Sequence, residues 1–500
     1  MIKYILLIFF VIVNAEVWES SFTAGTFDYD NNFMGGSEIL QLVSHKSKLF
    51  ASISYWQDEA NIWYGGNNAS LGWSQIISLE GPNEDWFVDL NLDSYYLRPE
   101  VLKQIVFTKD LFGNDLSSPD TLLIVAAYTS NYIFNPVTAS AFVRNDEDNS
   151  WKISTIYEGS LPTEGESYSI RDMQIYTDQV TGKEMLFTSV GTKGIFIGQY
   201  NASLEQKIEW NSVPEFGPLD IRPLGMVVAN NQLYFSSGNK VYKRIDGLNP
   251  EYIIIHDFSD LNSNINSAVG GIRGLTVLNN EYNDSMLLMW CPNSQSKGTI
   301  FRLDPNLNGS FDRVYETKLS LLVEDYLPST SVNYLLGAYN DFFKVFNHTD
   351  NEYYHIVGFE SIIQGGNYPS WNGYYSGALF AKRNSNAEYV LEEINQFISF
   401  NDPELVATRC YVESPFPNEN AIYFGGFDPN GFLSTNKAWI YKKIINLSGD
   451  FNNDGVINIL DVLQLVNYIL INQFDDSVDL NEDGAINILD IVQLVNIILN

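Results

Sequence analysis

A dipeptide that ends in arginine recurs along the middle of the chain, before short apolar runs. Three copies follow one another at intervals of 51 residues. The recurring pairs are Leu97-Arg98, Ile170-Arg171, Ile221-Arg222, Ile272-Arg273 and Thr408-Arg409. Self-similarity at a period of about 40 to 50 residues is typical of architectures that repeat one supersecondary unit. This repeat constrains the fold more than any other feature of the sequence.

Each repeat contains short runs of alternating aromatic and aliphatic residues that are bounded by Gly, Asn and Asp. Such runs predict antiparallel hairpins, and long helical patterns are absent from this part of the chain. The clearest examples are "KEMLFTSVGTKGIFIGQY" from Lys183, "NNQLYFSSGNKVYKRI" from Asn230, "SMLLMWCPNSQSKGTIFRL" from Ser285 and "NAIYFGGFDPNGFLSTNKAWIYKKI" from Asn420.

The repeats resemble the blades of a β-propeller of unassigned family. We therefore predict a mainly β fold, a six- or seven-bladed β-propeller over residues 16–445, followed by a small all-α module over residues 446–500. The segment "VWESSFTAGTFDYD" from Val17 is expected to supply a strand that closes the last blade. The candidate blades are residues 33–90, 97–155, 166–212, 220–256, 270–325, 330–395 and 404–445.

Equivalent positions of successive blades face one another across the propeller axis, so the recurring arginines are expected to converge there. Guanidinium groups suit bidentate capture of carboxylate or sulfate groups, which predicts an anionic polysaccharide as ligand. The alternative is that each arginine bridges to a carboxylate of a neighbouring blade, such as Asp172 or Asp220, and only holds blades together. The candidate ligand-binding residues are Arg98, Arg171, Arg222, Arg273 and Arg409.

The last tenth of the chain contains a short acidic loop twice, "DFNNDGVINILD" and "DLNEDGAINILD". Asp or Asn stands at positions 1, 3, 5, 9 and 12 of each twelve-residue loop, and glycine stands at position 6. Hard oxygen ligands at this spacing bind Ca²⁺, with position 7 contributing only a backbone carbonyl. We predict two Ca²⁺ ions, bound by Asp450, Asn452, Asp454, Val456, Asn458 and Asp461, and by Asp479, Asn481, Asp483, Ala485, Asn487 and Asp490.

An apolar run with helical spacing follows each loop, so the module is expected to hold one amphipathic helix per loop. Residues 446–500 contain no Lys or Arg. A unit this small rarely supports a core alone, so its folding is expected to require the metal.

Duplicated loops with Asp at position 12, each followed by one helix, resemble the dockerin module of cellulosomes and related secreted glycan-degrading systems. The resemblance covers about residues 446–500. It implies a cohesin-like or other protein partner, which dockerins contact through loop positions 10 and 11. Those positions are occupied by Ile459, Leu460, Ile488 and Leu489. Because all four side chains are apolar, we predict an apolar partner-binding surface. The alternative is that these side chains belong to the core of the module.

The N-terminus predicts the compartment. Lys3 precedes an apolar run, and small residues at Val13 and Ala15 precede Glu16, as in a secretory signal peptide over residues 1–15. We therefore expect a secreted, extracellular or cell-surface protein without membrane insertion. The formal charge of −33 argues against nucleic acid as a partner. The two cysteines, Cys291 and Cys410, either pair or remain two buried thiols.

No catalytic motif stands out, because the chain has neither a G-x-S-x-G nor an H-E-x-x-H sequence. Two function classes follow. In the first, the propeller is a glycoside hydrolase or another carbohydrate-active enzyme that a calcium-dependent module attaches to a partner. In the second, it is a non-catalytic binding or scaffold protein whose C-terminal module has a structural, calcium-stabilised role.

Overall fold

The computed structural model describes most of the larger unit and parts of the C-terminal segment. The predicted signal peptide lies outside the described residues. The described residues are 17–55, 74–92, 96, 98–129, 136–163, 165–265, 270–280, 283–293, 297–307, 309–337, 341–347, 352–365, 370–371, 373–394, 405–417, 419–428, 438–445, 449–451, 457–471, 478–481 and 484–499.

Antiparallel sheets dominate the described ranges, and the prediction of a mainly β chain is confirmed. Four sheets have four strands each. They are β8 (Val101–Lys109), β9 (Asp115–Tyr128), β10 (Val137–Asn145) and β11 (Ser150–Gly159); β12 (Met173–Thr177), β13 (Glu184–Val190), β14 (Gly194–Tyr200) and β15 (Ile208–Trp210); β16 (Pro223–Ala229), β17 (Gln232–Ser237), β18 (Lys240–Ile245) and β19 (Glu251–Asp257); and β20 (Gly271–Leu278), β21 (Ser285–Cys291), β22 (Thr299–Pro305) and β23 (Phe311–Lys318).

A larger sheet joins the first and last strands of the chain in the order β1-β33-β32-β4-β5-β6-β7, with β31 also paired to β32. The backbone N–H of Ala24 donates to the carbonyl of Ala438 at 2.9 Å, beside these strands. The members are β1 (Val17–Thr23), β4 (Glu38–His45), β5 (Lys48–Ser54), β6 (Gln75–Leu79), β7 (Phe87–Asn91), β31 (Ala407–Glu413), β32 (Ala421–Phe427) and β33 (Trp439–Ile444); a short hairpin pairs β2 (Thr26–Phe27) with β3 (Phe33–Met34).

The remaining sheet is organised around the long strand β26 (Glu352–Gly365). The other members are β24 (Thr330–Gly337), β25 (Phe343–Asn347), β27 (Ser370–Trp371), β28 (Tyr374–Tyr375), β29 (Phe380–Arg383) and β30 (Tyr389–Glu392). The helices in the described residues are α1 (Leu319–Tyr326), α2 (Ile459–Ile471) and α3 (Ile488–Leu499), with one short 3₁₀ turn, η3 (Gly191–Lys193). None of these helices has the length and apolar character that a membrane span needs.

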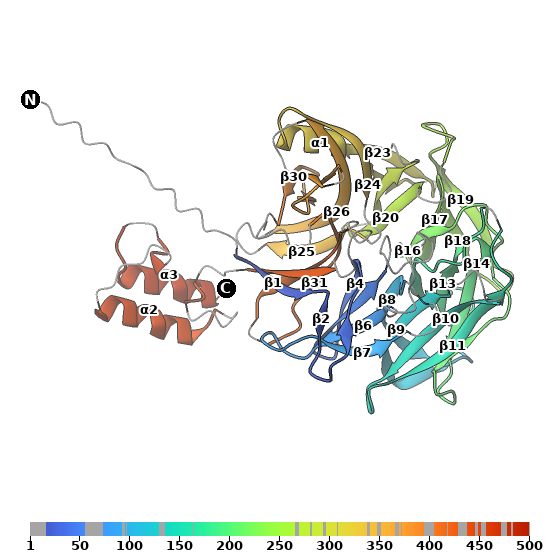
Figure 1. Ribbon diagram of the computed structural model, residues 1–500, viewed down its shortest axis with the longest axis horizontal. Coiled ribbons are helices and arrows are strands. Elements are labelled where there is room, and N and C mark those ends of the chain that lie inside the picture. Colours follow the sequence, from blue (N-terminus) through green and yellow to red (C-terminus); the bar gives the residue numbers. More distant parts are fainter. Residues whose placement is uncertain are drawn as a thin grey trace, which may run out of the picture. The chain divides into compact units, whose positions relative to one another are not determined.

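The sheets follow one another around a common centre, and β4, β8, β16 and β20 lie near that centre (Figure 1). All four hairpins predicted from the sequence are present, as β13–β14, β17–β18, β21–β22 and β32–β33. The recurring arginines also occupy equivalent places. Arg98, Arg171 and Arg222 stand shortly before β8, β12 and β16, and Arg273 and Arg409 lie near the start of β20 and β31.

The core consists of layers between neighbouring sheets. Phe107 and Ile124 pack with Leu186 and Phe196 of the next sheet, and equivalent layers join the other sheets. Inner strands such as β13 are therefore buried on both faces, which explains their unbroken apolar sequence, whereas an outer strand such as β19 alternates toward solvent. Cys291 and Cys410 are buried and are held as thiols.

Contacts divide the chain into two compact units. The larger unit comprises Ser20–Phe416 and Tyr423–Tyr441, and α2 and α3 belong to the other. Val462, Leu465, Val478 and Leu494 form the small core between these two helices.

We expect Gly426→Ala to lower the free energy of unfolding of the larger unit by about 1–3 kcal/mol, because overpacking in a tight core costs this much. A Cβ atom on Gly426 would lie 1.8 Å from Cζ2 of Trp439, whose side chain is fully buried. Denaturant unfolding followed by Trp fluorescence measures the loss.

Gly225→Ala is the matched control in another inner strand, because its Cβ atom would lie 3.4 Å from Leu275 and can be accommodated. Equal stability changes in the two variants would show that Trp439 does not fill the space above Gly426.

Candidate functional site

Buried charged side chains alternate in sign where the first strands of several sheets meet. Nε of Arg98 donates to Glu38 at 2.9 Å, and its Nη1 donates to Glu100 at 3.1 Å. Arg171 reaches the same carboxylate of Glu100 at 3.4 Å. On the other side of Glu38, Nε of Arg409 lies 3.7 Å from its second carboxylate oxygen. The charges thus form a continuous series, Arg409–Glu38–Arg98–Glu100–Arg171.

Arg409 extends this series to the sheet that contains β26. Its Nη2 donates to Glu360 at 3.0 Å, and the hydroxyl of Tyr334 donates to the other oxygen of Glu360 at 2.9 Å. The guanidinium of Arg409 also lies 4.3 Å from the ring centroid of Phe427. A buried charge without a partner costs several kcal/mol, so each member of the series depends on its neighbours.

The other two predicted arginines have different surroundings. Nη1 of Arg222, which is half-buried, donates to the hydroxyl of Ser169 at 3.0 Å. Arg273 is buried within β20.

Tyr128, at the end of β9, was not predicted from the sequence. Burial raises the pKa of Tyr128, and the Glu100 carboxylate adds to the rise. Three of the five predicted arginines, Arg98, Arg222 and Arg171, oppose it, so the Tyr128 phenol lies within the electrostatic field of these arginines.

These contacts match the alternative reading for Arg98, Arg171 and Arg409, in which arginines bridge neighbouring sheets. The carboxylate partners are Glu38, Glu100 and Glu360, whereas Asp172 and Asp220 were the examples expected from the sequence. Ligand binding by the five arginines stays a prediction.

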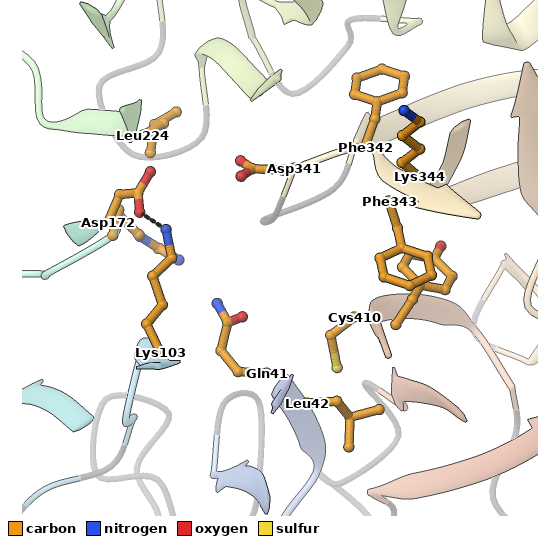
Figure 2. Close-up of a pocket in the computed structure, with 12 residues that line it drawn as sticks. Gln41, Leu42, Lys103, Asp172, Leu224, Asp341, Phe342, Phe343, Lys344 and Cys410 are labelled. Carbon is orange, nitrogen blue, oxygen red and sulfur yellow. Dashed lines mark hydrogen bonds and ion pairs between the residues drawn. The ribbon is translucent and has the colours of Figure 1, made fainter. Parts of the chain in front are cut away.

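A cavity of about 400 Å³ opens further along the same first strands, and we call it the central cavity (Figure 2). It receives side chains from the sheets that begin with β4, β8, β12 and β16, and from β25 and β31. Its lining is Gln41, Leu42, Lys103, Arg171, Asp172, Leu224, Asp341, Phe342, Phe343, Lys344, Cys410 and Tyr411.

Lys103 and Asp172 form an ion pair on one wall of the central cavity. Asp172 accepts two further hydrogen bonds, from the backbone N–H of Met173 at 2.8 Å and of Met226 at 2.6 Å. Burial alone would lower the pKa of Lys103, but Asp172 and Asp341 outweigh that effect and raise it. The pair therefore stays charged and links β8, β12 and β16.

Asp341 faces the Lys103–Asp172 pair across the central cavity (Figure 2). The surrounding protein raises the pKa of Asp341 to about 7, the Asp172 carboxylate adds to the rise, and Lys103 opposes it. The side chain is exposed to the cavity, so solvent reaches the carboxyl group. A carboxyl group with a pKa near neutrality can both donate and accept a proton at physiological pH.

The loops before α2 and α3 share one pattern of hydrogen bonds around the aspartate at position 12. Asp461 accepts the backbone N–H of Phe451 and of Asn458, each at 2.8 Å. Asp490 accepts the backbone N–H of Asn481 at 3.3 Å and of Asn487 at 2.7 Å.

The asparagine at position 9 caps the helix that follows each loop. The side-chain carbonyl of Asn458 accepts the backbone N–H of Leu460 at 2.8 Å, and Asn487 does the same for Leu489. Of the predicted metal ligands, the structure describes Asp450, Asn458, Asp461, Asp479, Asn481, Ala485, Asn487 and Asp490, whereas Asn452, Asp454, Val456 and Asp483 lie outside the described residues.

The donor set fits a hard cation. Asp461 and Asp490 are fully buried, although residues 446–500 contain no Lys, Arg or His to supply the opposite charge. Buried carboxylates of this kind are paired or coordinate a metal. Among the described residues alone, no group of three or more His, Cys, Asp or Glu side chains gathers as a metal site, since part of each loop is not described.

The predicted partner-binding residues lie on the surface of the module. Ile459, Leu460, Ile488 and Leu489 are between 52% and 67% exposed, so the alternative of burial in the module's own core does not hold for them. Leu463 and Val492, one turn further along each helix, are exposed at equivalent positions. Each helix therefore presents the same apolar face, which we call the repeated apolar face.

Comparison with solved structures gives resemblances of low identity. A thermostable family-43 glycoside hydrolase has 10% identity, and the alignment covers 75% of this chain and 99% of that one with a TM-score of 0.33. The catalytic domain of the Coprinopsis cinerea GH62 alpha-L-arabinofuranosidase has 13% identity, covering 86% and 97%, with a TM-score of 0.31. A Trypanosoma rangeli sialidase in complex with sialic acid has 7% identity, covering 76% and 58%, with a TM-score of 0.32. Scores this low decide neither the fold nor the activity of this chain.

Comparison with curated proteins gives no match. Comparison with protein families identifies the C-terminal segment. Residues 448–499 match the Dockerin type I domain, which confirms the resemblance drawn from the two loops and supports Ca²⁺ and a protein partner for this part of the chain.

Proposed function

We propose that this chain is a secreted, carbohydrate-directed protein that its dockerin domain attaches, in the presence of Ca²⁺, to a partner bearing a cohesin. The observation that carries the proposal is the duplicated loop that matches the Dockerin type I domain, with a buried aspartate at position 12 of each copy. Association with dockerins also favours a polysaccharide as the target of the larger unit, although fold and company alone never establish an activity.

The dockerin domain binds two Ca²⁺ ions in this proposal, one per loop. Because the two loops share their hydrogen bonds to Asp461 and Asp490, both sites are equally prepared for an ion. The ions neutralise the buried carboxylates, and their binding free energy becomes folding free energy for the small module.

The repeated apolar face is the proposed surface for the cohesin. Exposed apolar side chains at matching positions of α2 and α3 are explained by docking better than by solvation. Since both helices present equivalent residues, a partner can engage either helix after a rotation of about half a turn. Because the partner-facing residues are apolar, affinity is expected to depend on shape and area rather than on salt.

The larger unit is proposed to be a seven-bladed β-propeller. The seven blades begin with β4, β8, β12, β16, β20, β25 and β31, and β1 completes the last of them. In this arrangement β1, from the start of the chain, pairs with β33 at the outer edge of the last blade and so links the two ends of the ring.

Two functions are proposed for the larger unit, each favoured by one observation. Asp341 in the central cavity favours a glycoside hydrolase, because a carboxyl group with a raised pKa suits a general acid. The ion pairs of Arg98, Arg171 and Arg409 favour a non-catalytic binding or scaffold protein, because these arginines already have carboxylate partners. An anionic sugar at the arginines would have to replace those carboxylates.

Removal of Ca²⁺ is expected to unfold the dockerin domain and leave the larger unit intact, since only the small module depends on the metal. Far-UV circular dichroism of residues 446–500 with and without chelator measures the helical signal, and thermal unfolding of the full chain reports the larger unit. A helical signal that chelator leaves unchanged would contradict the proposal.

Asp461→Ala is expected to weaken Ca²⁺ binding at one loop only, with the second loop as internal control.

Replacing the four predicted partner-binding residues by Ser is expected to weaken capture of cohesins at least about a hundredfold, because hot-spot truncations each cost about 2 kcal/mol or more. A panel of immobilised cohesins probes the full chain in Ca²⁺. The variant carries Ile459→Ser, Leu460→Ser, Ile488→Ser and Leu489→Ser.

The exposed residues Val180 and Leu248 of the larger unit provide the control, since their replacement by Ser removes similar apolar area elsewhere. Capture that survives the fourfold substitution, with Ca²⁺-induced helicity preserved, would exclude this face as the docking surface.

Asp341→Asn is expected to reduce release of reducing sugars from polysaccharide at least about a hundredfold, since general acid catalysis contributes this much. As a proton donor, Asp341 is active when protonated, so activity is expected to fall as pH rises through about 7. Arabinan, xylan, galactan and pectin serve as substrates. Asp220→Asn, at an exposed carboxylate outside the central cavity, is the control. Hydrolysis that Asp341→Asn leaves unchanged would remove Asp341 from the mechanism.

A further inference from the structure

A second and larger hollow lies between the β20–β23 sheet and the strands β25, β26 and β29. Its volume is about 680 Å³, which is within the range of ligand-binding clefts. We call it the inter-sheet cleft. Its lining is Val277, Leu278, Asn279, Asn280, Asn283, Ser285, Arg302, Asp304, Pro305, Lys344, Tyr353, His355, Arg383 and Ser385.

One wall of the cleft is a connected series of hydrogen bonds. The amide of Asn280 donates to Ser285 at 2.8 Å, and Ser285 donates to Asp304 at 2.7 Å. Nε and Nη2 of Arg302 donate hydrogen bonds to the two carboxylate oxygens of Asp304, at 2.7 and 2.8 Å. This guanidinium lowers the pKa of Asp304, so the carboxylate stays ionised and fixed in place.

The floor of the cleft is rigid and balanced in charge. Nη1 of Arg302 donates to Glu316 at 2.9 Å. Arg383 donates to both oxygens of Glu316, at 2.7 and 2.8 Å. Two arginines therefore face two carboxylates, Asp304 and Glu316, and Lys344 is the additional positive charge in the lining.

The opposite wall supplies an aromatic face and a neutral imidazole. Tyr353 is 53% exposed and packs edge-on against Phe346, with ring centroids 4.9 Å apart. Burial, together with the positive charges of Arg383 and Lys344, lowers the pKa of His355 to about 4. Above that pH the imidazole is neutral, so one ring nitrogen donates a hydrogen bond and the other accepts one.

We propose that the inter-sheet cleft binds a saccharide through its hydroxyl groups. Amides, hydroxyls, a fixed carboxylate and a neutral imidazole offer both donors and acceptors, which is what a polyhydroxylated ligand requires. An apolar ligand would bury these groups without using the hydrogen-bonding capacity that they do not spend on one another, and each buried group left unsatisfied costs about 1–3 kcal/mol. Nζ of Lys344 lies 4.2 Å from the ring centroid of Tyr353, so a sugar ring would stack through its C–H face on the side of the ring that Lys344 leaves open.

The site is separate from the central cavity and does not require it to bind sugar or to be catalytic. Lys344 lines both hollows. A polysaccharide held in the inter-sheet cleft would therefore run close to the central cavity, so the cleft adds an anchoring subsite to the proposed function of the larger unit.

Affinity electrophoresis of the full chain in gels that contain soluble arabinan, arabinoxylan, galactan or β-glucan tests the proposal. We expect retardation by at least one of these polysaccharides. Tyr353→Ala and Asn280→Ala are each expected to weaken it about tenfold, the loss of one good contact. Since hydroxyl recognition does not rely on net charge, the retardation is expected to persist at high salt.

Tyr315→Ala is the matched control, because Tyr315 is 57% exposed and packs edge-on against Phe301 outside the cleft. Melting temperatures close to that of the parent chain confirm that the variants are folded. No retardation by any of the four polysaccharides, retardation lost at high salt, or retardation unchanged in both cleft variants would overturn the proposal. Retardation lost only in Asp341→Asn would place the sugar in the central cavity, which overturns this inference and leaves the proposed function standing.

Discussion

The ion pairs of the Glu38 carboxylate join strands from the start and the end of the larger unit. Glu38 is fully buried at the start of β4, with Arg98, which precedes β8, on one side and Arg409 of β31 on the other. The desolvation penalty of such a group is several kcal/mol, and the two arginines offset it together with the hydroxyl of Ser54, which donates to the same carboxylate. Ion pairs therefore hold these strands together in addition to the apolar layers between neighbouring sheets.

Open space is found beyond these ion pairs. The ion pairs link the inner strands at one level, and the central cavity opens further along these strands, where Gln41 and Cys410 are among its lining residues. The Lys103–Asp172 pair repeats the principle further along the strands and binds the backbone of Met226 as well. Asp341 faces this pair from the other side of the central cavity (Figure 2).

The sequence predicted what depends on local pattern. Alternation and turn residues located the hairpins around Lys183, Asn230 and Ser285, and the 51-residue interval placed Arg171, Arg222 and Arg273 at equivalent strand starts. It could not pair Arg98 with Glu38, because 60 residues separate them and nothing in either neighbourhood marks the match. Asp341 follows no repeat, and Tyr128 ends an ordinary apolar strand. The inter-sheet cleft is assembled from six segments, so no local signal could have revealed it.

Buried carboxylates have different surroundings in the two units. In the larger unit each buried carboxylate of the central series has an arginine partner within the chain itself. The dockerin segment has no Lys, Arg or His, and the buried carboxylates of Asp461 and Asp490 accept backbone N–H groups and fit a cation as the opposite charge. In the proposal made above, packing and these ion pairs stabilise the larger unit, whereas folding of the proposed docking surface on α2 and α3 requires Ca²⁺. Attachment would then respond to the metal while the larger unit keeps its structure.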